Sequence, residues 1–296
     1  MNFKSIFITG GAGYAGSCLV PELLKKGYKV TVYDIMYYTD NFLPKNNPNL
    51  TITKGDIRDK EKIYSSCQNH DVFIHLACIS NDTSFALDEK LSTSINLDAF
   101  EPMVEAAKNA GIKRFIYASS SSVYGISEEK NVTEDHPLVP LTLYNKYKGL
   151  CEPILFKHTD KNFEGVIFRP ATVCGFAPRQ RLDLSVNILT NFAVNKGMIK
   201  VFGGNQLRPN LHVMDYSDAV QVLIESDSKS IQNQIFNIGY QNLSILEIAN
   251  LVKKVVEKKF PEKGNINIIR ESSDDNRSYH INSDKIKNLL NYSPKR

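Results

Sequence analysis

Three glycines spaced three residues apart, Gly10, Gly13 and Gly16, constrain the fold of this 296-residue chain more than any other feature. A β-rich segment, residues 5–9, precedes them, and residues 14–26 have helical spacing. In a strand–turn–helix unit the first glycine permits a tight turn, the second lets backbone N–H groups approach a pyrophosphate, and the third allows close helix–strand packing. The helix N-terminus itself favours an anion. The pattern therefore predicts a dinucleotide-binding loop; a glycine-rich turn without a ligand is the alternative.

Strand and helix signals alternate through the first half of the chain. Residues 71–77 are almost continuously apolar, which is typical of a strand covered on both faces. Repeated β-α-β units predict an α/β fold with a doubly wound parallel sheet, the Rossmann arrangement, in which ligands bind at the carboxyl ends of the strands. Strands are expected at 5–9, 29–34, 50–55, 71–77, 113–119 and 165–168, and helices at 14–26, 88–110 and 144–158.

The alternation loosens after residue 169, so two units are expected. Residues 1–168 are predicted to form the dinucleotide-binding domain, and residues 169–296 mainly a smaller α/β substrate lobe, some of whose segments return to the first domain. In the lobe, Ser244 and Glu247 form a capping-box pattern at the start of a helix over 244–259. Other elements are expected at 183–195, 199–202, 234–238 and 266–269, and a further helix near residue 292, where the sequence given ends.

Composition argues against several classes of protein. Lys and Arg number 36 against 32 Asp and Glu, and the basic residues are spread along the chain, so no nucleic-acid partner is expected. No apolar run approaches the roughly 18 residues of a membrane span, and no signal peptide is evident. The five cysteines have no Cys-x-x-Cys pair and the six histidines no His-x-x-x-His pair, so neither a disulfide framework nor a metal site is predicted. A reduced cytoplasm is the expected location.

Asp34 closes the second predicted strand and indicates the kind of dinucleotide. A carboxylate there can accept hydrogen bonds from an adenosine ribose and repels a 2′-phosphate, and residues 35–38 contain no Arg or Lys. NAD is therefore predicted rather than NADP. Asp56 and Ile57, after the third strand, are candidates for contact with the adenine, although Asp56 taken alone is more typical of a turn.

A serine, a tyrosine and a lysine form the candidate catalytic group. Tyr144 and Lys148 lie four residues apart, on one face of a predicted helix. A nearby ammonium lowers the pKa of a phenol from about 10, and a positively charged nicotinamide lowers it further, which gives a general base near neutrality. Ser120 follows a buried strand, where its hydroxyl can bond a substrate oxygen. The Tyr/Lys spacing alone is common on solvated helices; its combination with Ser120 and the glycine loop is what indicates catalysis.

At this point the chain resembles the extended short-chain dehydrogenase/reductase family. The similarity is to its NAD-dependent nucleotide-sugar epimerase/dehydratase group, which includes the UDP-galactose 4-epimerases and bacterial surface-sugar relatives. The matching stretches are TGGAGYAG at 9–16, Asp34, GDI at 55–57, HLA at 75–77, SSSSVYG at 119–125, YNKYK at 144–148, RPATVCG at 169–175, LRPNLHVMD at 207–215 and DDNRSYHINSDKI at 274–286.

The resemblance implies roles for individual residues. Ser120 matches the catalytic Ser/Thr, Tyr144 the base, and Lys148 the residue that lowers the base's pKa and holds the nicotinamide ribose. Cofactor contacts are implied for Gly10, Gly13, Tyr14, Ala15, Gly16, Asp34, Asp56, Ile57, Leu76, Ala77 and Asn96, together with Tyr144 and Lys148. Substrate contacts are implied for Ser120, Thr172, Asn187, Arg208 and Arg277, the two arginines and Asn187 toward the nucleotide diphosphate.

Three departures from the family pattern bear on the reaction. The 4,6-dehydratases place Asp-Glu after the catalytic Thr, whereas Ser121 and Ser122 stand here, so water elimination is disfavoured. Thr172 occupies a position where Asn is common. Arg179 and Arg181 resemble a subgroup that includes bacterial heptose-modifying dehydrogenases; a solvated loop is the alternative.

The sequence and the resemblance together predict an NAD-dependent nucleotide-sugar 4-epimerase. It would act by transient oxidation at C4, in the biosynthesis of surface polysaccharide or a related sugar. A nucleotide-sugar 4-dehydrogenase or 4-ketoreductase, including the GDP-heptose type, uses the same atoms and stays open, as does a non-catalytic dinucleotide-binding subunit. The resemblance also implies a homodimer through the helices at 88–110 and 144–158, although Pro102 and Pro153 interrupt them. The nucleotide and the sugar are left open.

Overall fold

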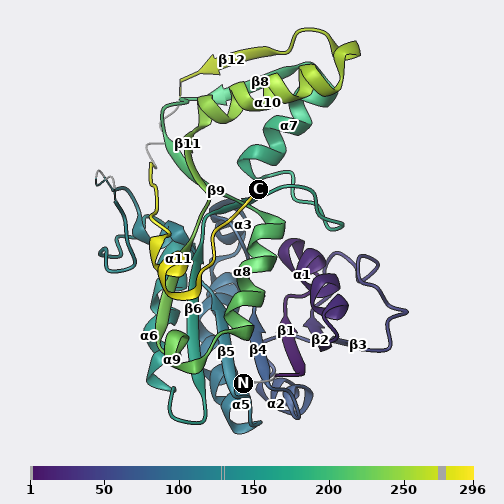
Figure 1. The fold of residues 1–296 in the computed structure, drawn as a ribbon, viewed down its shortest axis with the longest axis vertical. Helices are drawn as coiled ribbons and strands as arrows, with labels where there is room; N and C mark the ends of the chain where they lie inside the picture. Colours follow the sequence, from purple (N-terminus) through teal and green to yellow (C-terminus); the bar gives the residue numbers. More distant parts are fainter. Residues whose placement is uncertain (1–2, 128, 130, 273–277) are drawn as a thin grey trace.

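A seven-stranded parallel sheet forms the centre of the molecule (Figure 1). The computed structural model describes residues 3–127, 129, 131–272 and 278–296. The strand order is β10-β6-β5-β4-β1-β2-β3, and it reverses between β1 and β4, the switch point at which doubly wound sheets bind ligands. This confirms the predicted fold class. The strands are β1 (Ser5–Thr9), β2 (Lys29–Asp34), β3 (Leu50–Lys54), β4 (Val72–His75), β5 (Arg114–Ala118), β6 (Glu164–Pro170) and β10 (Gln234–Ile238).

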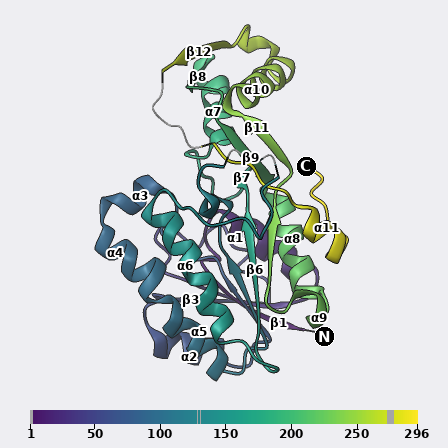
Figure 2. The ribbon, with the colours of Figure 1, turned by 90° about the vertical axis from the view of Figure 1, so that its left-hand side faces the viewer.

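Helices cover both faces of this sheet (Figures 1 and 2). On one face α1 (Tyr14–Lys25) packs against α8 (Val213–Glu225). On the other lie α2 (Lys60–Cys67), α5 (Phe100–Asn109) and α6 (Leu143–Lys157). Every residue of β4 and β5 is buried, because each strand packs between two helical layers. This is why these strands have continuous apolar sequences rather than alternating ones.

The smaller lobe stands above the carboxyl ends of the strands (Figure 1). Its core is formed by two helices and a two-stranded parallel sheet: α7 (Ser185–Lys196), α10 (Ile245–Lys259), β8 (Met198–Phe202) and β12 (Asn267–Glu271). A three-stranded sheet joins it to the large domain: β11 (Gln241–Ser244), β9 (Leu207–His212) and β7 (Thr172–Cys174). The short elements are α9 (Ser228–Ile231), α11 (Asp284–Leu290) and η3 (Pro261–Lys263). β10 is an edge strand of the large sheet, and α8 and α11 pack on the large domain. We therefore propose that residues 213–238 and 284–290 belong to the large domain. The other residues after 169 are assigned to the lobe.

The structure corrects the single helix expected over 88–110. The segment divides into α4 (Glu89–Thr93), a π-helical turn η1 (Ser94–Asp98) and α5. Pro102, in the first turn of α5, has no N–H for a bond back along the helix, and the change of register precedes it. Pro153, in contrast, lies inside α6 without ending it.

Other local expectations also differ from the structure. The short helices α2 and α3 (Asp82–Leu87) were not predicted. No helix begins at Tyr292; instead its hydroxyl donates a hydrogen bond of 2.6 Å to the Asp215 carbonyl. Within the described residues, no helix is both long and apolar enough to span a membrane.

Candidate active site

The parallel sheet brings the predicted motifs to one edge. The glycine loop follows β1, Asp34 ends β2, Leu76 and Ala77 follow β4, and Ser120 follows β5. The carboxyl ends of parallel strands meet at the same edge, and the smaller lobe covers that edge (Figure 1).

The glycine loop fits the diphosphate of a dinucleotide. Gly10 has φ +76, and a Cβ there would lie 2.5 Å from the backbone nitrogen of Ala77. A Cβ on Gly16 would lie 2.3 Å from the carbonyl oxygen of Gly11. Gly13 is the N-cap of α1, and no side chain caps this helix among the described residues. The first N–H groups of α1, those of Tyr14, Ala15 and Gly16, are therefore suited to an anion.

The Asp34 carboxylate is fixed beside this loop. Its Oδ2 accepts from the backbone N of Ala12 at 3.1 Å, and its Oδ1 accepts from the backbone N of Met36 at 2.9 Å. Two carboxylate oxygens have about four lone-pair sites, so acceptor capacity is left for ribose hydroxyls. The residues present thus fit NAD.

The other predicted adenine contacts are placed but already have protein partners. Asp56 forms an ion pair with Arg58, whose hydrogen bond holds the pKa of that carboxyl below its usual value. Ile57 is buried. Asn96, in η1, accepts from the backbone N of Ile79 at 2.9 Å and donates to its carbonyl at 2.8 Å. Asn96 therefore holds the segment that follows Leu76 and Ala77, and its direct contact with the cofactor stays a prediction.

Tyr144 lies in the first turn of α6, half-buried at the sheet edge. Burial raises the pKa of its phenol well above 10, the charge of Cys78 adds to this, and the Arg181 guanidinium opposes it. Lys148, one turn further on, is buried, and its Nζ donates to the Ala118 carbonyl at 2.8 Å. The expected lowering of the Tyr144 pKa is therefore not what the protein alone shows, because desolvation dominates and the ammonium is hydrogen-bonded to the backbone.

A chain of hydroxyl groups connects Ser120 to the catalytic helix. The Oγ atoms of Ser120 and Ser122 lie 2.7 Å apart, and Ser122 Oγ donates to Asn145 Oδ1 at 2.5 Å. Asn145 is adjacent to Tyr144. The sequence did not single out Ser122 as a bonding partner or Asn145 at all, although both lie within the motifs that contain Ser120 and Tyr144. The available signal was their position in the sequence: Ser122 lies two residues after Ser120, in η2 (Ser121–Tyr124), and Asn145 follows Tyr144 in α6.

A buried ion pair between Arg169 and Glu152 lies next to the segment that follows β5. Arg169 donates from Nε and Nη2 to the two oxygens of Glu152, at 2.9 and 2.6 Å. Ser119 Oγ donates to Glu152 Oε1 at 2.6 Å, and Arg169 Nη1 donates to the Tyr124 hydroxyl at 2.7 Å. The pair positions β5, β6 and α6 relative to one another. Sequence reasoning missed it because its members lie on different elements.

Three of the predicted substrate residues, Thr172, Asn187 and Arg208, lie on the smaller lobe's side of the edge. Thr172 is in β7, opposite Asn210 of β9. Arg208, in β9, lies with its Cζ 5.3 Å from the centre of the Tyr279 ring. Arg277 lies outside the described residues.

Asn187 has a structural role that the sequence did not predict. Its Oδ1 accepts from Gly175 N at 2.9 Å, and its Nδ2 donates to the Tyr14 hydroxyl at 3.2 Å and the Arg181 carbonyl at 2.8 Å. The residue therefore holds the loop before α7 against α1. Contact between Asn187 and a diphosphate stays a prediction.

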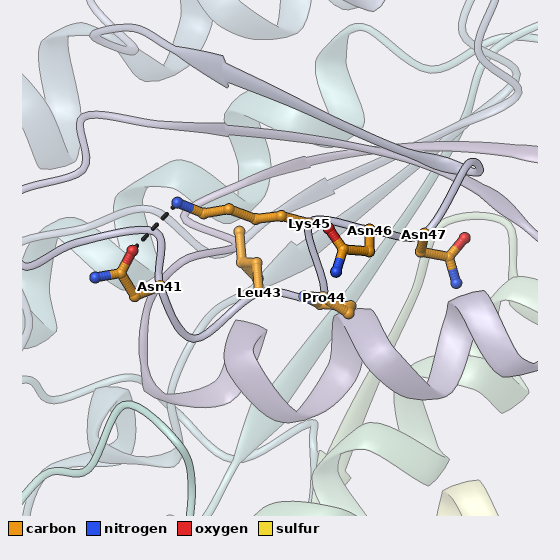
Figure 3. Close-up of a pocket in the computed structure, with 6 residues that line it drawn as sticks. All are labelled: Asn41, Leu43, Pro44, Lys45, Asn46 and Asn47. Atoms are coloured by element: carbon orange, nitrogen blue, oxygen red, sulfur yellow. Dashed lines mark hydrogen bonds between the residues drawn. The ribbon is translucent and has the colours of Figure 1, made fainter.

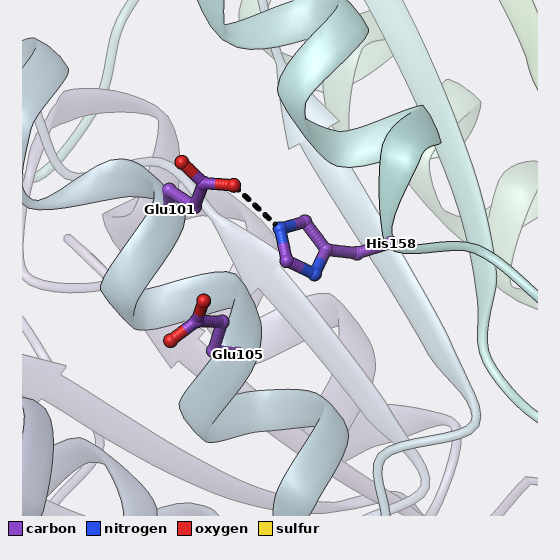
Figure 4. Close-up of side chains that lie close together, drawn as sticks. All are labelled: Glu101, Glu105 and His158. Atoms are coloured by element: carbon purple, nitrogen blue, oxygen red, sulfur yellow. Dashed lines mark hydrogen bonds and ion pairs between the residues drawn. The ribbon is translucent and has the colours of Figure 1, made fainter.

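Two surface features lie outside this edge. Residues 41, 43–47 line a hollow in the loop after β2, where Lys45 Nζ donates to Asn41 Oδ1 (Figure 3). Glu101, Glu105 and His158 lie within 4.8 Å of one another (Figure 4). Both carboxylates already pair with lysines, Glu101 with Lys157 and Glu105 with Lys60. These pairs neutralise the cluster.

Comparison with known sequences identifies the family. The profile of the NAD dependent epimerase/dehydratase family matches residues 6–239, most of the chain. The chain belongs to this family. It is therefore an enzyme, and NAD is its cofactor, as the glycine loop and Asp34 predicted.

Individual members of the family are similar over nearly the whole chain. UDP-glucose 4-epimerase 4 of Oryza sativa subsp. japonica is 28% identical over 292 residues, covering 87% of this chain and 78% of that protein. The low-salt glycan biosynthesis protein Agl12 of Haloferax volcanii is 28% identical, covering 96% of this chain and 92% of that protein. The structure of MoeE5 in complex with UDP-glucose and NAD is 26% identical, with a TM-score of 0.83 and coverage of 99% of this chain and 94% of that chain.

Proposed function

We propose that this family member is a nucleotide-sugar 4-epimerase, acting in the biosynthesis of surface polysaccharide or a related sugar. The similarity to UDP-glucose 4-epimerases and to MoeE5, which holds UDP-glucose, supports a nucleotide sugar as substrate. The convergence of Ser120, Tyr144 and Lys148 beside the dinucleotide loop supports chemistry at a sugar hydroxyl.

The chain's own residues then divide the work. NAD, when bound, supplies the capacity to accept and return a hydride at C4. Tyr144 takes the proton from O4 and later gives it back, and Ser120 hydrogen-bonds the same oxygen. Ser122 and Asn145 orient the Ser120 hydroxyl. Lys148 provides a positive charge beside the phenolate.

Substrate contacts must hold one end of the molecule while the other turns. An epimerase returns the hydride to the opposite face, so the sugar has to rotate while its diphosphate stays bound. We assign the diphosphate to Arg208 and Arg277 and the sugar site to Thr172, while Asn187 fixes the loop before α7.

The observation that favours epimerisation over dehydration is that Ser121 and Ser122, rather than an Asp-Glu pair, follow Ser120. Elimination of water needs an acid and a base near C5 and C6, whereas Ser121 is buried and Ser122 is bonded to Ser120 and Asn145. Hydroxyl groups with ordinary acidity do not perform that proton transfer.

The test uses nucleotide sugars deuterated at C4, with no cofactor added to the purified protein. UDP-, GDP- and dTDP-linked sugars are incubated in turn, and the products are resolved by chromatography and mass spectrometry. An inverted sugar that keeps deuterium at C4 is expected. A 4-keto product in an amount equal to the enzyme, with loss of the label, would overturn epimerisation in favour of the 4-dehydrogenase. No change in any sugar would contradict both.

We further propose that the protein acts in the reduced cytoplasm as a homodimer, with neither nucleic acid nor membrane as partner. Its five cysteines are free thiols, which suits a reducing compartment. The dimer is argued below from the outer face of α6.

A further inference from the structure

An arginine of the smaller lobe stacks on a tyrosine of the large domain beside the dinucleotide loop. The Cζ of Arg179 lies 3.6 Å from the centre of the Tyr38 ring, well within the range of a cation–π contact. Tyr38 lies in the loop after β2, and Arg179 lies between β7 and α7. The contact therefore bridges the two parts of the molecule.

Both partners are anchored next to the site of the adenosine diphosphate. Tyr38 follows Asp34, whose carboxylate is bonded to Ala12 and Met36, and Met36 has φ +57, which bends the chain there. The backbone N of Arg179 donates to Ser17 Oγ, in the first turn of α1, at 3.3 Å.

A second set of contacts keeps the Arg179 loop on α1. The Tyr14 hydroxyl donates to the Gly175 carbonyl at 2.7 Å, and Asn187 bonds the same hydroxyl. Tyr38 is thus fixed beside Asp34, the proposed ribose contact, and Arg179 is fixed beside the start of α1, where the glycine loop is expected to bind the diphosphate.

The unpaired charge of Arg179 and the exposed ring of Tyr38 indicate that the pair binds a ligand. Among the described residues, the Arg179 side chain contacts the Tyr38 ring and, weakly, the Gln180 carbonyl at 3.4 Å, but no carboxylate. Arg181, two residues on, is paired with Asp183. Tyr38 remains 64% exposed and the adjacent Tyr37 82% exposed, which is a large aromatic surface to leave in water. An unpaired cation beside a helix N-terminus suits an anion.

We propose that Arg179 and Tyr38 form a clasp that closes over the diphosphate of NAD and retains the dinucleotide on the enzyme. Arg179 supplies a positive charge for the diphosphate in addition to the α1 N–H groups, and Tyr38 holds the guanidinium plane in place. The clasp concerns the cofactor, so it holds whether the sugar is epimerised or oxidised. Retention is what an enzyme needs if the same dinucleotide is to serve both halves of a reaction.

The test measures release of the dinucleotide without any sugar. Full-length protein is loaded with NADH, mixed with excess NAD in a stopped-flow instrument, and the loss of NADH fluorescence is followed. Arg179→Met and Tyr38→Leu are expected to speed release about tenfold each. Tyr38→Phe keeps the ring and should release like wild type. Tyr64→Leu, at an exposed tyrosine of α2, is the matched control and should also leave release unchanged.

Two further measurements make the outcome decisive. The double variant should release no faster than the faster single variant, because the two side chains act as one unit. Arg179→Met should weaken binding of ADP-ribose and leave that of adenosine unchanged. Wild-type release rates in both single variants, additive effects in the double variant, or equal weakening of adenosine would each overturn the clasp. Circular dichroism checks folding, and Arg179→Lys, which keeps the charge, should recover part of the retention. Failure of the deuterium experiment would not affect these results.

Discussion

Tyr144 carries a phenol that the protein alone holds in its protonated form. Burial raises its pKa well above 10, and Lys148 donates its hydrogen bond to a backbone carbonyl instead. A base with such a pKa is inactive near neutrality until positive charge is brought closer. Bound NAD brings that charge on its nicotinamide, so we expect Tyr144 to act as the proposed base only in the complex.

Removing the phenol oxygen should abolish most activity. Tyr144→Phe keeps the ring packing and is expected to lower the rate by about 10²–10⁴, the usual effect of losing a general acid–base group. Affinity for NAD, measured by fluorescence titration, should change little. Turnover like that of wild type in the folded variant would rule out Tyr144 as the base.

The pH dependence should report the same group. The unprotonated phenol is the active form, so the rate of C4 oxidation in a single turnover should rise with pH and level off above the pKa of Tyr144 in the complex. Lys148→Met removes a nearby positive charge, which raises that pKa, so the rise should move to higher pH by about one unit or more. An unchanged profile would show that Lys148 does not act on the phenol.

Asp34 should decide between the two dinucleotides. Its carboxylate lies beside the glycine loop, bonded to the backbone N of Ala12, where we expect it to repel a 2′-phosphate, so wild type should bind NAD more tightly than NADP. Asp34→Ala removes the repulsion and should reduce the ratio of the two affinities, NAD over NADP, about tenfold. Equal affinities of the wild-type protein for the two dinucleotides would contradict this role.

At the scale of elements, the buried Arg169–Glu152 pair joins β6 to α6 beside Ser119, which precedes the proposed catalytic Ser120. Both side chains are almost fully buried. Ser119 donates a further hydrogen bond to Glu152, and Arg169 Nη1 donates to the Tyr124 hydroxyl. Such a pair contributes little net stability compared with apolar residues, but losing one partner leaves a buried charge without compensation.

Breaking this pair should destabilise the whole large domain. Glu152→Ala is expected to lower the free energy of unfolding by about 3–5 kcal/mol, measured by urea titration. Replacing both members, Glu152→Met with Arg169→Met, should recover part of the loss. Glu22→Ala, which breaks the more exposed pair with Lys25, is the control and should change stability by under about 1 kcal/mol. A loss of that small size in Glu152→Ala would contradict the role given to the pair.

At the scale of the whole molecule, the outer face of α6 is the surface we assign to the homodimer. Leu150 is 43% exposed, Pro153 is exposed beside it, and Tyr147 and Ile154 are half-buried on the same side. These positions, three or four residues apart, form an apolar stripe along the helix. Figure 2 shows α6 on the face of the molecule turned toward the viewer, beside α3 and α5.

A charge in this stripe should separate the subunits. Light scattering at micromolar concentration should give twice the chain mass for wild type and the chain mass for Leu150→Arg. Leu251→Arg, at a leucine that is 49% exposed on α10, is the matched control and should stay dimeric. A monomeric wild-type protein would refute the assembly.

The sequence by itself determined the features that depend on neighbours along the chain. The glycine loop joins β1 to α1. Buried strands such as β4 can be recognised in the sequence as apolar runs, because both of their faces are covered. The capping box of Ser244 and Glu247 is present as predicted, because its bonds lie within one helical turn. Asp34 was placed beside the glycine loop for the same reason, since it ends β2 and that strand pairs with β1.

Only the tertiary structure decided what depends on contacts between distant segments. Strands β7 and β11 are short, and their pairing with β9 defines them. The direction of the Lys148 ammonium depends on the Ala118 carbonyl at the end of β5, and the stacking of Arg179 on Tyr38 depends on how the two parts of the molecule meet. Periodicity and residue type describe one segment at a time, whereas the energy of a buried charge or a stacked ring is set by the groups that folding brings around it.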